Sequence, residues 1–174
     1  PVKETWGDTA VPIRKAHYDS RQVGEGDLFV AMRGLEVDGH RFIQKALDQG
    51  AKGIIAQEAP QSVKLDIGWV RVENSRAALG PISSKLHGEP SKDLLVAGIT
   101  GTNGKTTNGF LIQHLLNAAN RPAGLLGTVE YDLGFGKTEK ATHTTPESSE
   151  VQRLLGEMRD NGCRGAVMEV SSHA

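Results

Sequence analysis

The sequence is poor in cysteine, in aromatic residues and in long apolar runs. Cys163 is the single cysteine among 174 residues, and aromatic residues make up 5% of the chain. One cysteine cannot form an internal disulfide, and it excludes a zinc site built from several cysteines. Residues 1–6 contain no apolar signal core, and the longest apolar runs are far too short to span a bilayer. We therefore expect a reduced, cytoplasmic setting.

An excess of charge of either sign is also missing. Lys and Arg number 20 against 21 Asp and Glu, for a formal net charge of −1. No block of basic residues alternates with aromatic ones, which argues against nucleic acid as a partner. The length allows one large or two small domains. We predict two, 1–88 and 89–174, because residues 89–92 combine proline with polar residues, as linkers do.

The most informative stretch is the glycine-rich segment 98–107. It follows an apolar run, 94–97, that we expect to be a buried strand, and it precedes residues 110–116, which have helical spacing. Strand, glycine loop and helix in this order are the context that a phosphate-binding loop requires, because backbone N–H groups and the positive end of the helix can together surround an anion. Lys105 would neutralise phosphate charge, and Thr106 would place its hydroxyl on a bridging magnesium ion.

The spacing of the loop is a variant of the general pattern. Gly98 lies six residues before Gly104, and the residue five before it is Ile99. A glycine-rich turn without a ligand is the plain alternative. The loop resembles that of the Mur ligases and of their relative folylpolyglutamate synthase, which form amides through an acyl phosphate. The resemblance implies ATP and Mg²⁺ as cofactors, Lys105 as a catalytic residue, and nucleotide contacts from Gly101, Thr102, Asn103, Gly104, Lys105, Thr106 and Thr107.

A second motif lies near the N-terminus, in residues 18–31. It contains a polar turn, two glycines and a short apolar strand, and Asp19 and Ser20 could simply close an Asx-type turn. The segment looks like a signature of the Mur ligase branch that adds the third peptide residue. In that branch it meets the UDP end of the substrate, so the resemblance implies that Ser20 binds substrate and that 1–88 is a UDP-substrate domain.

The remaining pattern of the first half is mixed α/β. We predict a short helix over 41–50 whose core residues are Phe42, Ile43, Ala46 and Leu47. Strands are expected at 53–56 and 69–72. Residues 74–76 can cap a helix that reaches residue 86, although Pro81 disturbs its first turns.

The second half reads as a doubly wound, mostly parallel sheet. A strand at 123–129 follows the first helix, and residues 131–140 suggest a solvent-facing hairpin or loop rather than a buried element. A threonine is expected to cap the next helix, whose apolar stripe comprises Val151, Leu154, Leu155 and Met158. Residues 165–170 form an apolar parallel strand. Ligands of such sheets collect beyond the carboxyl ends of the strands.

Glu169 is the one charged residue near the end of that last strand. A carboxylate there can help to hold magnesium, and an unpaired one in an apolar strand would be costly without a cation. A structurally paired glutamate is the alternative. Residues 168–174 look like a motif of the same Mur ligase branch, which implies that Thr106 and Glu169 serve the metal and Ser171 the substrate. The same resemblance assigns Thr144 and Thr145 to substrate binding, whereas from sequence alone they would be helix caps.

Three further residues receive no catalytic role. His143 stands where relatives often carry another residue, and a structural role for His173 is at least as well supported as a ligand role. Cys163 is a small core or edge residue, because nothing in the sequence nominates a base partner for it.

The resemblance covers residues 19–173 and implies a ligase that joins an amino acid to UDP-N-acetylmuramoyl-L-alanyl-D-glutamate with ATP. The first alternative is a non-catalytic nucleotide-binding module, and the second is a folylpolyglutamate synthase-like ligase. We expect the chain to be a fragment of a protein that is monomeric at full length and lies outside the membrane. The amino acid, meso-diaminopimelate or L-lysine, stays open, with the former favoured as the widespread choice. We also expect strand 166–170 to present an exposed apolar edge.

Overall fold

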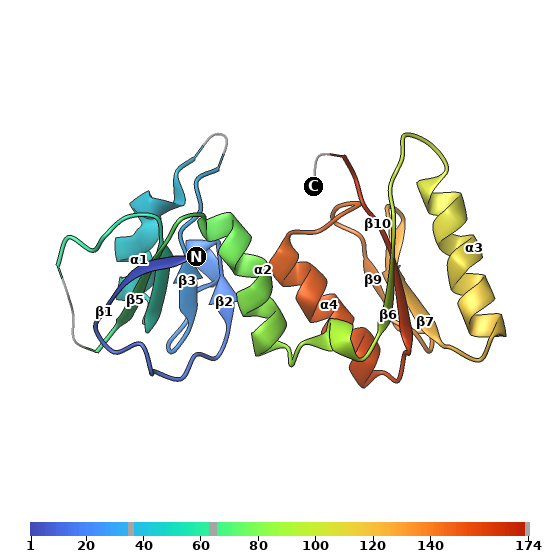
Figure 1. Cartoon of the computed structure of the whole chain (residues 1–174), viewed down its shortest axis with the longest axis horizontal. Coiled ribbons are helices and arrows are strands. Elements are labelled where there is room, and N and C mark those ends of the chain that lie inside the picture. The colour runs from blue at the N-terminus through green and yellow to red at the C-terminus, as the bar shows by residue number, and fades with distance from the viewer. Residues whose placement is uncertain (35–36, 63–65, 173–174) are drawn as a thin grey trace. The chain divides into compact units, whose positions relative to one another are not determined.

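A computed structural model of the chain describes residues 1–34, 37–62 and 66–172 (Figure 1). The chain divides into two compact units, Pro1–Leu86 and His87–Ala174. Each unit contains its own five-stranded sheet with helices, so the predicted α/β class is confirmed. Across the described residues, no helix is both long enough and apolar enough to span a membrane.

The first unit is built on a mostly parallel sheet with the strand order β1-β5-β4-β3-β2. Its strands are β1 (Val2–Trp6), β2 (Ala16–His17), β3 (Leu28–Val30), β4 (Gly53–Ala56) and β5 (Gly68–Val72). Strands β2 to β5 are parallel, and β1 pairs with β5 in the antiparallel direction. The helices are α1 (Ile43–Asp48), α2 (Ser75–Leu86) and two 3₁₀ turns, Ser20–Gln22 and Gly39–Phe42.

Alternating side chains of the central strands build a core on each face of this sheet. Phe29 and Ile54 pack with Ala46 of α1, whereas Val30 and Ile55 pack on the other side with residues of α2. The cap expected for α2 is confirmed, because Asn74 Oδ1 accepts a hydrogen bond from the Ala77 N–H at 3.0 Å. Phe42 was wrongly predicted as a core residue. It ends a 3₁₀ turn instead of entering α1, and 39% of its surface is exposed.

The second unit has the strand order β6-β10-β7-β8-β9. Its elements are a 3₁₀ turn (Pro90–Lys92), β6 (Leu95–Ile99), α3 (Lys105–Ala118), β7 (Ala123–Leu126), β8 (Glu130–Asp132), β9 (Thr138–Lys140), α4 (Ser148–Asp160) and β10 (Gly165–Glu169). Strands β6, β10 and β7 are parallel, and β8 and β9 form an antiparallel hairpin. The doubly wound pattern follows, because α3 and α4 cover opposite faces of the sheet (Figure 1).

The apolar stripe predicted for α4 is confirmed. Leu154, Leu155 and Met158 are buried in one core cluster with residues of β7, β8 and β10, and Val151 packs against it. The 131–140 segment is a hairpin, as one of the expected forms. Its predicted solvent-facing character is confirmed for residues 135–138 and 140, which are exposed, and is wrong for Tyr131, which is 1% exposed and belongs to the same core.

One edge strand of this sheet is β6, and the other is β9. We predicted a buried strand near 94–97, but Leu95 and Val96 are 48% and 38% exposed, because β6 pairs only with β10 among the described strands. The expectation that strand 166–170 lacks cover is also wrong. β10 pairs on both sides, with β6 and with β7, and is largely buried. Exposed apolar side chains of α3 accompany the β6 edge: Phe110, Leu111 and Leu115.

Candidate functional site

The loop between β6 and α3 has the backbone shape of an anion cradle. Gly101 and Gly104 have φ values of +139° and +79°, a region that side chains disfavour and that glycine adopts freely. Helix α3 begins at Lys105, so its free N–H groups and positive dipole face the loop. Lys105 Nζ donates a hydrogen bond to the Gly101 carbonyl at 2.7 Å. The ammonium group therefore lies over the loop in which phosphate would bind.

Glu169 ends β10, an interior strand of the sheet, and is 1% exposed. Its Oε2 accepts from the Thr106 hydroxyl at 3.2 Å, and 63 residues of sequence separate the two. Its two carboxylate oxygens also accept from Thr128, whose amide and hydroxyl each lie 3.2 Å away. Glu169 is therefore hydrogen-bonded, as the alternative of a structurally paired glutamate requires. Neutral donors hold the group, and its negative charge remains available to a cation.

Gly127 and Thr128, which were not predicted as site residues from the sequence, follow β7 and receive the Glu169 side chain. A Cβ atom on Gly127 would lie 2.7 Å from Glu169 Oε1, so only glycine leaves room for the carboxylate there. Thr128 also contacts Thr144, with 3.1 Å between the hydroxyl oxygens. The sequence feature that could have indicated them is a Gly-Thr pair at the carboxyl end of a predicted strand, because ligand-binding residues gather there in such sheets.

Thr144, Thr145 and Ser171 meet at the same edge of the sheet. Thr145 Oγ1 donates to the Glu169 carbonyl at 2.9 Å and accepts from the Ser171 N–H at 2.9 Å. The expectation that a threonine caps α4 is wrong, because Glu147 is the N-cap and accepts from the Ser148 N–H. Thr145 instead fastens the turn before α4 to the residues that follow β10.

The atoms around Glu169 suit a hard divalent cation. One carboxylate and the hydroxyls of Thr106 and Thr128 supply oxygen only, and oxygen is what Mg²⁺ prefers. The neighbouring phosphate loop would supply the further oxygen ligands through bound phosphates. Thr106 and Glu169 therefore fit the metal role expected of them.

The predicted substrate segment of the first unit lies at the carboxyl end of β2. Ser20 opens a 3₁₀ turn and is 6% exposed, and the preceding Asp19 accepts from the Arg21 N–H at 2.9 Å. The Asx-type turn considered from sequence is thus present. Arg21 also pairs with the Asp19 carboxylate at 2.7 Å, and this hydrogen bonding lowers the pKa of Asp19.

Family comparisons match both units of the chain. The sequence model of the Mur ligase family, catalytic domain, matches residues 12–86, and that of the Mur ligase middle domain matches residues 99–174. The chain belongs to the Mur ligase family. The second match contains the phosphate loop, Thr128, Thr145 and Glu169, so the contacts described above lie within the Mur ligase middle domain.

Curated relatives agree with this Mur ligase assignment. A UDP-N-acetylmuramoyl-L-alanyl-D-glutamate–2,6-diaminopimelate ligase of Geobacter metallireducens is 42% identical over 98% of this chain and 33% of its own length. One of the same name from Clostridium botulinum is 45% identical over 93% of this chain and 34% of its own. The chain thus spans about a third of the length of these relatives.

Solved Mur ligase structures share the fold. A structure of a UDP-N-acetylmuramoyl-L-alanyl-D-glutamate–2,6-diaminopimelate ligase matches with a TM-score of 0.70 at 24% identity, over 93% of this chain and 32% of that one. The MurF ligase of Thermotoga maritima in complex with ADP matches with a TM-score of 0.60 at 27% identity, over 96% and 34%.

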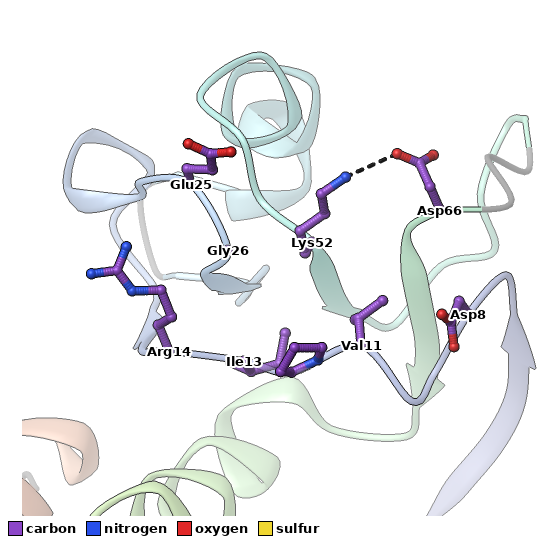
Figure 2. Close-up of a pocket in the computed structure, with 9 residues that line it drawn as sticks. Asp8, Val11, Ile13, Arg14, Glu25, Gly26, Lys52 and Asp66 are labelled. Atoms are coloured by element: carbon purple, nitrogen blue, oxygen red, sulfur yellow. Dashed lines mark hydrogen bonds and ion pairs between the residues drawn. The ribbon is translucent and has the colours of Figure 1, made fainter.

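One hollow in the first unit of this Mur ligase chain lies away from Ser20. Figure 2 shows it at the amino ends of the parallel strands, with Val11 and Ile13 along one wall and charged groups at the rim. Its volume is about 590 Å³, and Ser20 does not line it. Lys52 Nζ faces Asp66 Oδ2 across 2.9 Å, so its charge is already paired. The hollow therefore does not contain the predicted substrate residue.

The residues left without a role fit structural functions. Cys163 is fully buried, and burial raises the pKa of its thiol, which opposes a nucleophilic role. The backbone carbonyl of His143 accepts from the Tyr131 hydroxyl at 2.7 Å, which anchors the segment that leads to Thr144. His173 lies outside the described residues.

Proposed function

We propose that the chain is the substrate-binding and nucleotide-binding part of an ATP-dependent ligase of peptidoglycan precursor synthesis. Such a ligase would join meso-diaminopimelate to UDP-N-acetylmuramoyl-L-alanyl-D-glutamate. Relatives 40% to 45% identical that carry this name support the choice of substrates. The observation that carries the proposal is the contact between Thr106 and Glu169 beside the phosphate loop, because it unites the predicted metal and phosphate ligands.

The phosphate loop would bind the β and γ phosphates of ATP. Its backbone N–H groups and the start of α3 supply fixed positive potential, which costs no reorganisation when charge shifts during phosphoryl transfer. Lys105 would exchange its present bond to the Gly101 carbonyl for the phosphate oxygens. The reaction then transfers the γ-phosphate to the acceptor carboxylate, and the incoming amine displaces phosphate from the acyl phosphate.

Thr106 and Glu169 would hold Mg²⁺, with Thr128 keeping the carboxylate in position. The ion, when bound, neutralises charge on the phosphate oxygens. Thr128 donates twice to Glu169 and thereby fixes both of its oxygens. The threonine and the glycine before it thus define where the negative charge of the site lies.

Four residues would contact the UDP-muramoyl substrate: Ser20, Thr144, Thr145 and Ser171. Thr144 and Thr145 are held near Glu169 by hydrogen bonds, which supports placing the substrate beside the metal and the nucleotide. The full protein would act in the cytoplasm, where ATP and UDP-linked precursors are found, and the resemblance to the Mur ligases implies that it would be a monomer.

Calorimetric titration of the chain with UDP-N-acetylmuramoyl-L-alanyl-D-glutamate and, separately, with Mg-ATP tests this proposal. Ser20→Ala should lower the affinity for the UDP-muramoyl substrate about tenfold, because one hydrogen bond to a charged group is lost. The affinity for Mg-ATP should stay unchanged. Ser62→Ala, at an exposed serine of the same unit, is the matched control and should change neither affinity. Equal weakening of both ligands by Ser20→Ala would refute the division of labour.

A further inference from the structure

A second hollow lies in the second unit, at the amino ends of the parallel strands β6, β10 and β7. Its volume is about 480 Å³, and its lining is rich in charge: Lys92, Asp93, Leu94, Leu95, Asn120, Arg121 and Arg164. The phosphate loop, Thr128 and Glu169 all follow the carboxyl ends of the same strands. The hollow is therefore separate from the site described above, and nothing in the proposed reaction uses it.

Sheet topology gathers the two arginines of this hollow. Arg164 immediately precedes β10, and Arg121 lies two residues before β7, its parallel neighbour. The Arg164 N–H donates to the Pro122 carbonyl at 2.7 Å, and its own carbonyl accepts from the Leu95 N–H at 3.0 Å. The Arg121 N–H donates to the Leu116 carbonyl at 2.9 Å. Both backbones are thus fixed, and both guanidinium groups start from a rigid edge.

Among the described residues, no ion pair neutralises either of the two arginines. Lys92 pairs with Glu89 at 2.9 Å, and Asp93 lies 3.8 Å from Arg159. By contrast, neither Arg121 nor Arg164 forms an ion pair with any residue in the described ranges 1–34, 37–62 and 66–172. This differs from the hollow of Figure 2, where Lys52 is paired with Asp66.

Capping of the helix ends does not explain these arginines. Helix α3 ends just before Arg121, and its last carbonyls accept from the N–H groups of Ala119, Asn120 and Arg121. Helix α4 ends before Arg164, and its last carbonyls accept from the N–H groups of Asn161, Gly162 and Cys163. Backbone donors therefore reach three of the last four carbonyls at each helix end, so the helix ends do not depend on the guanidinium groups, which can serve a ligand.

We propose that this hollow binds a small oxyanion of the phosphate class, with Arg121 and Arg164 as its principal ligands. Guanidinium groups match phosphate oxygens in bidentate geometry, and their charge is not lost at any physiological pH. The volume accommodates a diphosphate. The ligand is either a free oxyanion or the phosphate end of a nucleotide, bound at the sheet edge opposite the phosphate loop.

The test is a titration of the isotope-labelled chain with inorganic pyrophosphate, followed by backbone amide shifts in NMR spectra. A Lys105→Ala background weakens the competing phosphate loop, and the amides of 101–107 report on what remains there. The amides of 92–95, 121, 123 and 164–165 should shift with saturation. A parallel titration with ADP separates the sources: tighter binding of ADP at these amides assigns the site to a nucleotide, and equal or weaker binding assigns it to a free oxyanion.

Variants at the hollow make the outcome decisive. Arg121→Gln and Arg164→Gln should each lower the affinity for pyrophosphate, measured from the shifts of these amides, about tenfold. Each substitution removes a charged hydrogen-bond donor. Arg41→Gln, at an exposed arginine of the first unit, is the control and should change nothing. Unchanged spectra elsewhere show that each variant folds. Amide shifts confined to 101–107 would overturn the proposal. So would an affinity for pyrophosphate in the Arg121→Gln, Arg164→Gln double variant equal to that of the chain with both arginines.

Discussion

The Thr106 hydroxyl donates a hydrogen bond to Glu169 Oε2 at 3.2 Å, across 63 residues of sequence. Thr106 belongs to the first turn of α3 and Glu169 to the end of β10, so the contact joins the phosphate loop to an interior strand of the sheet. Glu169 is buried, so its hydrogen-bond donors help to fix the position of its carboxylate. The first prediction concerns the donor that contributes two of the three bonds.

Thr128→Val should destabilise the chain by about 1–3 kcal/mol, because a buried carboxylate loses a hydroxyl donor while the side-chain shape is kept. The same substitution should weaken Mg-ATP binding, since Glu169 Oε2 is no longer fixed. Urea unfolding measures the first effect and calorimetry the second. Thr128→Ser keeps the hydroxyl and serves as the control. A stability equal to that of the unaltered chain would show that the hydrogen bond at 3.2 Å contributes nothing.

The exposed apolar face beside β6 should cause the chain to self-associate. Leu111 and Leu115 of α3 are 53% and 57% exposed. Replacing both by Gln should weaken association by about 1 kcal/mol per leucine, which corresponds to partial burial of each side chain. Sedimentation velocity over a range of concentrations measures this. Val2→Gln, at a residue 63% exposed in the first unit, is the control. Association that persists undiminished in the double variant would place the contact elsewhere.

Cys163 should be unreactive in the folded chain. Its side chain is fully buried, and burial raises the pKa of the thiol, so both access and thiolate are lacking. Reaction with a disulfide reagent at neutral pH should proceed only as fast as the chain opens, and it should become rapid in urea. A native rate equal to that in urea would contradict the buried position between β10 and the hairpin.

Asp19→Asn should lower the stability of the chain only at pH values at which the Asp19 carboxyl group is ionised. The hydrogen bond from Arg21 lowers the pKa of Asp19 below its ordinary 3.8. A lowered folded pKa gives stability that is present above 3.8 and is lost as pH falls through the folded value. The effect should be roughly 0.5 kcal/mol, typical of a surface ion pair. Melting temperatures of both chains, compared from neutral to strongly acidic pH, should converge at the acidic end. A constant difference would assign the effect to packing.

Local patterns in the sequence predicted the phosphate loop and the stripe of α4. Both depend on neighbours within a few residues, namely glycines that permit positive φ and apolar residues at helical spacing. The metal pair, Thr106 and Glu169, was also predicted, because both follow strands whose carboxyl ends share an edge.

Strand order could not be derived from local patterns. β10 inserts between β6 and β7, which buries the last strand and leaves β6 at the edge, the reverse of what was predicted. The same long-range pairing brings Thr128 to Glu169 and makes Tyr131 a core residue. Propensity alone does not encode which strands pair across 40 or more residues, since that choice depends on how the whole sheet packs.

The measurement that bears most directly on the account is calorimetric titration of Mg-ATP into the chain and into Lys105→Ala. Lys105 lies over the loop, with its ammonium group 2.7 Å from the Gly101 carbonyl, so its removal takes away the main side-chain charge at the phosphates. Lys140→Ala, at an exposed lysine of the same unit, controls for the loss of one positive charge. We predict that Lys105→Ala lowers the affinity for Mg-ATP by a factor of about ten or more. Lys140→Ala should bind Mg-ATP with the affinity of the unaltered chain. Equal affinity in all three chains would contradict the phosphate-loop assignment.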